Sequence, residues 1–359
     1  MLNTKTLCAA FLYLFGAGVA FCQVPAPPPN VFHDYNYTFF TLPNGTGTLT
    51  AINNLDVVAG SYYPNTPPVF AMGYLRCPDG RVVTFSVPNA TSVTVNELND
   101  RGELVGVYQD STTGNDAGFI RHAGGKIETF ALNGAAGYTA PTGINIEGQV
   151  VGFLSTSNTG TPTLPFLRFR DGQYLTFGVE DSTTIFTRNI NDAGIALGSY
   201  FCSASQGGVC GFYGKPGGKL TTFSYPPNGL VPFEINNRNV VAGVVDTASG
   251  SEDYFIRKPD GKLILFGLTQ VDTDNCSIND EDEVIGDYSV YVPGPPPSGG
   301  TEYRYDIVRT PDGKIGNYDP PSSPGSLQGD AINDRGVIAG RLIAGFGGTS
   351  GLFLLTPKH

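Results

Sequence analysis

A short motif recurs seven times along this chain of 359 residues: an apolar residue, an asparagine and a third residue that is usually polar. A glycine follows each apolar anchor after eight residues, and the spacings between anchors are 46, 46, 46, 45, 43 and 54 residues. Such self-similarity indicates a repeat architecture in which each unit is one supersecondary structure. The anchors are Ile52, Leu98, Ile144, Ile190, Ile235, Ile278 and Ile332.

Each repeat predicts four short β-strands, and the second repeat shows the pattern clearly. The first strand ends at Leu98, and residues 103–108, 118–121 and 128–130 form the next three. β-Branched and aromatic residues at a period of two favour strands over helices. The residue four positions after every anchor is Gly, Asn or Asp, and Asp-Gly or Gly-Gly pairs separate the third and fourth strands. These residue types are typical of tight hairpin turns.

The fourth strand of the seventh unit is missing at the end of the chain, and a matching strand stands at its beginning. Residues 37–43 share with the fourth strands that end at 85–88 and 223–226 an aromatic residue three positions before a proline. We therefore predict an all-β, seven-bladed β-propeller over residues 36–359, with four antiparallel strands per blade and the N-terminal strand closing the ring. Closure removes exposed sheet edges. The alternative is a β-solenoid, which has parallel coils of shorter period and no strand exchange between the termini.

Residues 1–22 have the pattern of an export signal. Lys5 is the positive residue, Leu7–Phe15 is the apolar segment, and small residues follow. Cleavage after Ala20 or after Cys22 fits this pattern. The sequence therefore predicts a secreted protein, extracellular or periplasmic.

Residues 23–35 are rich in proline and are expected to form a stiff, extended linker. A lipid anchor at Cys22 is disfavoured because the bulky Phe21 precedes it. The chain has no run of 18 apolar residues, so no transmembrane segment is predicted.

Export places the cysteines in an oxidising compartment. Cys202 is expected to end the second strand of the fourth unit and Cys210 to begin the third, so we predict that these two form a disulfide. Cys77 and Cys276 are expected on blades one and five, which are not adjacent. A disulfide requires Cα atoms within about 7 Å, so these two cannot pair.

The consensus Ile-Asn-Asp-x-Gly-x-Val-Val-Gly, followed by Gly-Phe and by Thr-Phe-x-x-Pro, resembles the extracellular repeat proteins of the HAF family. Those are exported bacterial proteins, mostly of unknown function, and the resemblance covers nearly all of the mature chain. The His-Ala-Phe triplet that gives the family its name is absent here, where residues 116–119 and 209–212 take the equivalent places. The resemblance implies export and a repeat fold, and it supplies no catalytic residue.

Composition excludes several classes of function. With 21 basic and 32 acidic residues the net charge is −11, and no basic stripe exists for nucleic acid. Three histidines make a histidine triad or metal cage improbable, and no phosphate loop or serine-nucleophile motif occurs. The acidic segment 272–283 suggests calcium, but most of its residues are explained as turn residues. We predict no catalytic residue, metal or cofactor.

Repeated side chains are expected to be structural. An arginine ends the third strand in five units, at positions 76, 121, 168, 257 and 309, and we expect it to bond carbonyls of neighbouring blades or turn acids. The loops between strands two and three, and between strands four and one, vary instead. Variable loops on a rigid scaffold are the usual place for binding.

The sequence therefore predicts a non-enzymatic, exported binding or scaffold module that recognises a glycan or an extracellular protein through its variable-loop face. The alternative is a carboxylate-using glycoside hydrolase or lyase on the same fold, which needs inward-facing acids near the channel. A structural surface protein without a ligand is a third hypothesis. The candidate ligand-binding residues are Tyr63, Tyr108, Asp110, Phe201, Asp246, Asp287 and Tyr288.

Overall fold

The structure is a computed structural model. It describes residues 35–66, 70–132, 138–155, 163–179, 182, 184–247, 252–292, 301–318, 327–344 and 348–358. The predicted signal peptide and all but the last residue of the predicted linker lie outside these ranges.

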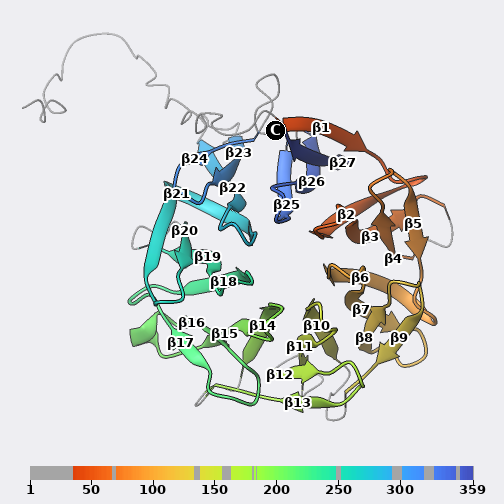
Figure 1. The fold of residues 1–359 in the computed structure, drawn as a ribbon, viewed down its shortest axis with the longest axis horizontal. Helices are drawn as coiled ribbons and strands as arrows, with labels where there is room; N and C mark the ends of the chain where they lie inside the picture. The colour runs from red at the N-terminus through yellow and green to blue at the C-terminus, as the bar shows by residue number, and fades with distance from the viewer. Residues whose placement is uncertain are drawn as a thin grey trace, which may run out of the picture.

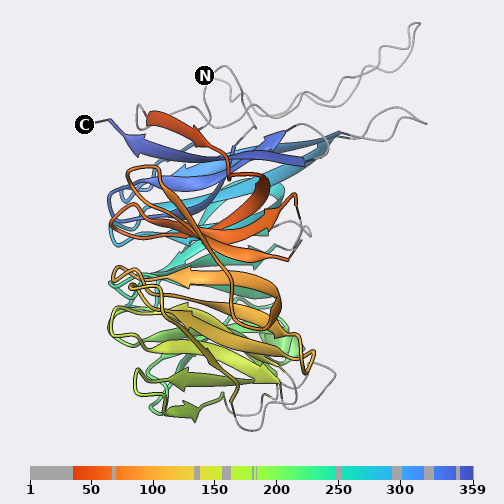
Figure 2. The same cartoon turned by 90° about the vertical axis from the view of Figure 1, so that its right-hand side faces the viewer.

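The described chain forms seven four-stranded antiparallel blades around a central axis, as predicted (Figure 1). The blades lie side by side as a thick disc (Figure 2). Blade 1 contains β2 (Gly45–Ile52), β3 (Val58–Pro64), β4 (Met72–Arg76) and β5 (Val82–Phe85). Blade 2 contains β6 (Ala90–Leu98), β7 (Leu104–Asp110), β8 (Asp116–Arg121) and β9 (Ile127–Phe130). Blade 3 contains β10 (Thr139–Ile144), β11 (Val150–Ser155), β12 (Thr163–Arg168) and β13 (Tyr174–Thr176).

Blade 4 has the one short helix of the described residues, η1 (Ala204–Gln206), between its second and third strands. Its strands are β14 (Ile185–Ile190), β15 (Ala196–Phe201), β16 (Val209–Gly214) and β17 (Thr221–Phe223). Blade 5 begins with β18 (Leu230–Ile235), β19 (Val241–Asp246) and β20 (Glu252–Arg257). Blade 6 ends with β22 (Val284–Val292), β23 (Thr301–Arg309) and β24 (Ile315–Gly316). Blade 7 contains β25 (Leu327–Ile332), β26 (Ile338–Ala344), β27 (Gly348–Pro357) and β1 (Tyr35–Phe40).

One strand serves two blades. β21 (Leu263–Ile278) pairs with β20 through its first half and with β22 through its second half, so blades 5 and 6 form one seven-stranded sheet. Cys276 therefore lies on the inner strand of blade 6, and the prediction of blade five was wrong. Blades 1 and 6 are also not adjacent in the ring, and neither Cys77 nor Cys276 forms a disulfide among the described residues.

The anchor motifs lie where the inner strand of each blade turns into the second. In all seven blades the inner strand ends at the anchor residue of the repeat, from Ile52 in blade 1 to Ile332 in blade 7. The residue four positions later has a positive φ in all seven blades, for example 75° at Gly102 and 65° at Asp282. This backbone conformation favours glycine, asparagine and aspartate, which explains the composition of the position.

The glycine eight residues after the anchor is required by a close approach to the neighbouring strands in six of the blades. Gly106 of β7 lies opposite Phe119 of β8, whose ring is completely buried. A Cβ atom on Gly106 would lie 2.0 Å from the Thr94 carbonyl oxygen and 2.7 Å from the Phe119 ring. The same pairing of glycine with an aromatic ring of the third strand occurs in blades 1, 3, 4, 5 and 7.

The strand from the N-terminus closes the ring, as predicted. β1 pairs antiparallel with β27 from Tyr35 opposite Pro357 to Phe40 opposite Leu352 (Figures 1 and 2). The strand starts two residues before the predicted Tyr37 and ends at Phe40, before Pro43. Tyr35 is 5% exposed and belongs to the apolar core of blades 6 and 7.

Deletion of residues 23–43 should lower the melting temperature sharply or cause aggregation, because it removes β1 and exposes the edge of β27. Deletion of residues 23–34 alone is the matched control and should leave β1 in place. Thermal unfolding with light scattering measures both effects. If the longer truncation melts like the control and stays monomeric, β1 does not close the ring.

Candidate functional site

The asparagine that follows each anchor residue takes part in a closed ring around the channel, at the face of the disc where the hairpin turns lie. The seven asparagines are Asn53, Asn99, Asn145, Asn191, Asn236, Asn279 and Asn333. The side-chain amide of each asparagine donates a hydrogen bond to the backbone oxygen of the next asparagine in the ring, at 2.9–3.2 Å. The last of these bonds joins Asn333 to Asn53 at 3.0 Å and closes the circle. The ring therefore links every blade to both of its neighbours.

The side-chain oxygen of the same asparagines stabilises the hairpin turn that follows each of them. The Oδ1 atom of Asn99 accepts the backbone N–H groups of Arg101 at 3.0 Å and Glu103 at 2.9 Å. Asn236 does the same with Arg238 and Val240. An aspartate would lack the donor and an aliphatic residue would lack both groups, so asparagine is the residue that this position needs.

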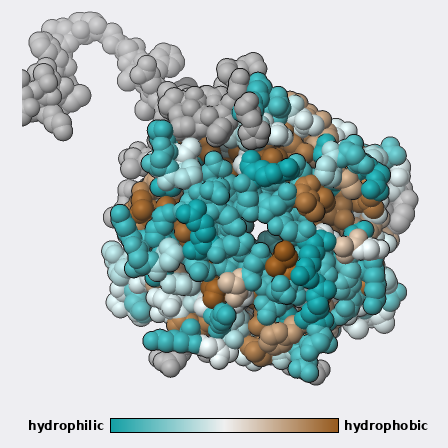
Figure 3. Space-filling view, viewed as in Figure 1, coloured by the Kyte–Doolittle hydropathy of each residue, from teal (hydrophilic) through white to brown (hydrophobic). Residues whose placement is uncertain are grey.

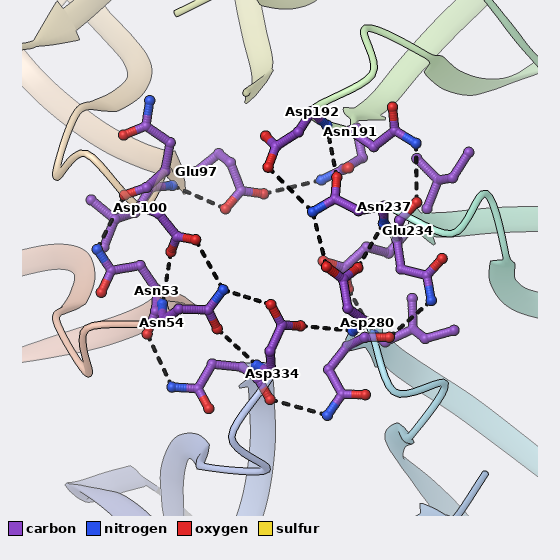
Figure 4. Close-up of a pocket in the computed structure, with 18 of the residues that line it drawn as sticks. Asn53, Asn54, Glu97, Asp100, Asn191, Asp192, Glu234, Asn237, Asp280 and Asp334 are labelled. Atoms are coloured by element: carbon purple, nitrogen blue, oxygen red, sulfur yellow. Dashed lines mark hydrogen bonds between the residues drawn. The ribbon is translucent and has the colours of Figure 1, made fainter. Parts of the chain in front are cut away.

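A second circle lies inside the first and is formed by the third residue of the motif (Figure 4). In six of the seven steps the backbone N–H of this residue donates to the side-chain oxygen of the next, at 2.7–2.9 Å. The circle is interrupted where Ile146 offers no oxygen. Its polar members are Asn54, Asp100, Asp192, Asn237, Asp280 and Asp334. The face shown in Figure 3 is accordingly hydrophilic around the central opening.

Two glutamates that the sequence analysis did not select line the same channel. Glu97 and Glu234 each stand one residue before the anchor, in blades 2 and 5, and border a cavity of about 140 Å³ (Figure 4). Glu97 accepts from the Leu98 backbone N–H at 2.9 Å and from the Asn189 amide at 3.2 Å. Glu234 accepts from the Ile278 backbone N–H at 2.9 Å.

The channel raises the pKa of both carboxyl groups. Burial is the main cause for each, and it raises the pKa of Glu97 to about 8 and that of Glu234 to about 7. The charge of Glu234 adds to the effect on Glu97, and the charges of Asp334 and Asp280 add to the effect on Glu234. Near neutral pH the pair can therefore hold and release protons, as acid–base catalysis requires.

The sequence carried a signal for these glutamates. The residue before the anchor is alanine, glycine, asparagine or serine in the other five repeats, and glutamate only in the second and fifth. A β-bulge precedes it, with a register shift between Val95 and Glu97 in blade 2. Simple alternation along the strand therefore cannot show which side chains face the channel.

Three of the predicted ligand-binding residues are buried. Tyr108 is 8% exposed, within the core of blade 2, and Asp287 and Tyr288 are 2% exposed. Tyr288 stacks on Tyr305 with ring centroids 5.2 Å apart. Asp287 accepts from the Gln328 amide at 3.0 Å. These positions pack neighbouring strands and blades together.

The other four predicted residues lie at the loop-side ends of the second strands. Tyr63 and Phe201 are 45% and 59% exposed. The Asp110 carboxylate accepts the Thr112 and Thr113 backbone N–H groups within its own loop. Asp246 is exposed on blade 5. The ring thus distributes these four over two pairs of adjacent blades, with Tyr63 and Asp110 on blades 1 and 2 and Phe201 and Asp246 on blades 4 and 5.

A cleft lies beside Phe201 on the surface of blade 4. It has a volume of about 850 Å³ and lies between the end of blade 3 and the outer strands of blade 4. The predicted disulfide between Cys202 and Cys210 is confirmed and borders this cleft, with Cα atoms 5.9 Å apart. Its lining includes Val179, Phe201, Ser203, Gln206, Lys219 and Thr222.

The recurring arginines stack on aromatic rings, an arrangement that differs from the predicted bonds to turn acids. Arg121 lies over Phe85 at 5.1 Å and Arg309 over Phe266 at 5.2 Å, in each case a ring of the preceding blade. Arg76, Arg168 and Arg257 make the same kind of contact. Arg168 donates to the oxygen of the next residue, Phe169, at 3.2 Å, which is not the predicted carbonyl of a neighbouring blade, and it forms an ion pair with Glu128 of blade 2. These arginines join adjacent blades and do not form a ligand ring.

Comparison with known proteins defines the class as a seven-bladed β-propeller. No family model matches the sequence, and no curated protein matches it. Among solved structures, streptogramin B lyase is similar with a TM-score of 0.56 and 13% identity, over 90% of this chain and 98% of that one. The β-propeller domain of the Trilobed protease from Pyrococcus furiosus has a TM-score of 0.55 and 9% identity, over 86% and 95%.

Puromycin hydrolase is also similar, with a TM-score of 0.60 and 11% identity, over 87% of this chain but only 52% of its own. All three likenesses concern the fold. In the part of the chain that the structure describes, no helix is long and apolar enough to cross a membrane.

Replacing Asn236 by alanine should destabilise the protein by about 3 kcal/mol. The variant loses the bonds of a buried amide to Asn279 and to its own turn, and it leaves buried groups without partners. Asn237→Ala, at an exposed position of the second circle, is the control and should cost less than about 1 kcal/mol. Urea unfolding followed by circular dichroism measures both, and equal effects would show that the ring does not stabilise the fold.

Stability should fall between pH 4.5 and pH 8. Both channel glutamates keep their protons in the folded state above the ordinary glutamate pKa of 4.5, so the folded state binds more protons than the unfolded chain in this range. The melting temperature should therefore be lower at pH 8.5 than at pH 5.5. Glu97→Gln should reduce this fall, whereas the control Glu147→Gln, on an exposed turn, should not. An unchanged slope in Glu97→Gln would contradict the assigned pKa.

Proposed function

We propose that this protein is an exported, non-enzymatic binding module that recognises a glycan or an extracellular protein through the variable-loop face of its propeller. The observation that carries the proposal is the cleft beside the Cys202–Cys210 disulfide. The cleft presents an exposed aromatic ring, Phe201, next to polar side chains of the same blade. Aromatic faces beside hydrogen-bonding groups are typical of specific recognition sites.

The local chemistry supports a rigid site. The disulfide fixes the loop that carries Ser203 and Gln206, and the Ser203 hydroxyl donates to Gln206 at 2.8 Å. The backbone N–H of Cys202 donates to the Gly208 oxygen at 3.0 Å. A loop that is held in one shape loses less entropy when it binds. Disulfides persist in oxidising compartments, which supports export and fits the proposed membership of the HAF family.

A glycan array, followed by calorimetry on the best glycan, tests the proposal. Phe201→Ala should weaken binding about tenfold or more, because it removes the exposed ring from the cleft. Phe39→Ala is the matched control, since Phe39 is 52% exposed on β1 in blade 7. If no glycan binds, pull-down from extracellular extracts with the same pair of variants tests for a protein ligand. Equal binding by both variants in every assay would reject the loop-face site.

The two channel glutamates favour a second candidate function, a carboxylate-using glycoside hydrolase or lyase. Such an enzyme uses two carboxyl groups, one of them with a raised pKa. Glu97 and Glu234 meet this description from opposite parts of the ring (Figure 4). Incubation of the bound glycan with the protein distinguishes the two functions. Product formation that Glu97→Gln abolishes would support the enzyme, and binding without product would support the binding module.

A further inference from the structure

A separate pocket lies between the inner strands of blades 2, 3 and 4. Its volume is about 380 Å³, enough for one small organic molecule. The walls come from β6, β10, β11 and β14, and none of the residues that were selected from the sequence belongs to it. The lining residues are Asn96, Thr142, Phe153, Phe186, Thr187 and Arg188.

Arg188 is a cation without a carboxylate partner. It forms no ion pair or hydrogen bond in the described part of the chain, and its one contact of note is with the Phe233 ring, 5.6 Å from the guanidinium carbon. The Arg188 side chain is exposed over part of its surface, so its guanidinium is open to a ligand at the mouth of the pocket. Partial burial lowers its pKa below the ordinary value of arginine, and no acid among the described residues opposes this effect. A carboxylate matches the paired donors of a guanidinium.

The position of Arg188 marks it as an exception within the repeat. It is the bulge residue of β14, between Thr187 and Asn189 in the register. The equivalent residues of the other inner strands are threonine, asparagine, phenylalanine or aspartate: Thr50, Asn96, Thr142, Phe233, Asp274 and Asp330. A basic residue therefore occurs at this position in one repeat of seven, in a protein of net charge −11. The arginines that join the blades occupy a different repeat position, so the blade scaffold does not explain Arg188.

The pocket walls supply a flat apolar surface beside this charge. Phe153 and Phe186 pack edge to face with centroids 5.2 Å apart, and both border the pocket. The Thr187 hydroxyl is completely buried at the same site and has no hydrogen-bond partner among the described residues. Buried hydroxyls normally have a partner, and a polar atom of a ligand in this pocket would be a suitable one for Thr187.

We propose that this pocket binds a small organic carboxylate with a flat apolar face. Arg188 receives the carboxylate and the two phenylalanines contact the flat body of the ligand. The ligand is an aromatic acid or a uronic acid residue, which share this chemistry. The proposal does not depend on the cleft beside Phe201, because the pocket shares no residue with that cleft.

Calorimetry with two matched pairs of probes tests the pocket. Phenylacetate is compared with neutral phenylacetamide, and a galacturonate dimer with a galactose dimer. We expect one of the two acids to bind at least tenfold more tightly than its neutral counterpart, and the pair that shows the preference identifies the source. Loss of the preference in Arg188→Gln supports the pocket. The control Arg101→Gln, whose side chain is 48% exposed on a hairpin turn, should keep it.

A readout on the unaltered protein makes the test independent of how the variant folds. In NMR spectra, the bound acid should shift the Nε–H resonance of Arg188, and the neutral analogue should not. Arg188→Lys should keep a weaker preference for the acid, because it retains the charge and loses the paired donors. The proposal is overturned if neither acid binds better than its neutral counterpart, if Arg188→Gln binds the acid like the unaltered protein, or if the Arg188 resonance does not respond.

Discussion

The hydrogen-bonded circle of seven asparagines is the interaction on which the rest of this structure depends. Each amide donates to the next blade and accepts from its own hairpin turn, so one side chain fixes both the turn and the distance between blades. The asparagines are 2–6% exposed, which shields these bonds from water. Hydrogen bonds in such surroundings are strong, and an unpaired group there is costly. The circle thus explains why the motif repeats without exception.

The remaining repeat residues extend the same linkage outward from the axis. The glycine of the second strand lets an aromatic ring of the third strand lie flat inside the blade. The arginine that ends the third strand then stacks on a ring of the preceding blade. β1 completes the outermost layer of blade 7. The asparagine circle, the packing within and between blades, and β1 thus hold the scaffold from its axis to its rim. The positions that differ between repeats are therefore available for function. They are the loop of blade 4, Glu97, Glu234 and Arg188.

The sequence predicted the scaffold well because its residues are fixed by turn geometry and close packing. The anchors marked the ends of the inner strands, and the positions of Cys202 and Cys210 predicted the disulfide. The ligand positions were harder. The second strand of blade 2 continues to Asp110, beyond the predicted end at residue 108, and that of blade 6 continues to Val292, so Tyr108 and Tyr288 both lie within paired sheet and are packed against other strands. The bulge in each inner strand changes which side chains face the channel, and alternation cannot show this.

Hydrogen exchange of the side-chain amides, followed by NMR with asparagine labelled by ¹⁵N, tests the central role of the asparagine circle most directly. The account predicts that seven carboxamide groups exchange slowly, at one common rate set by cooperative opening of the ring. In Asn236→Ala the other six should all lose protection together. Protection that is lost only at Asn191 and Asn279, the neighbours of the altered position, would contradict the account, because the blades would then be held pairwise and not as one closed circle.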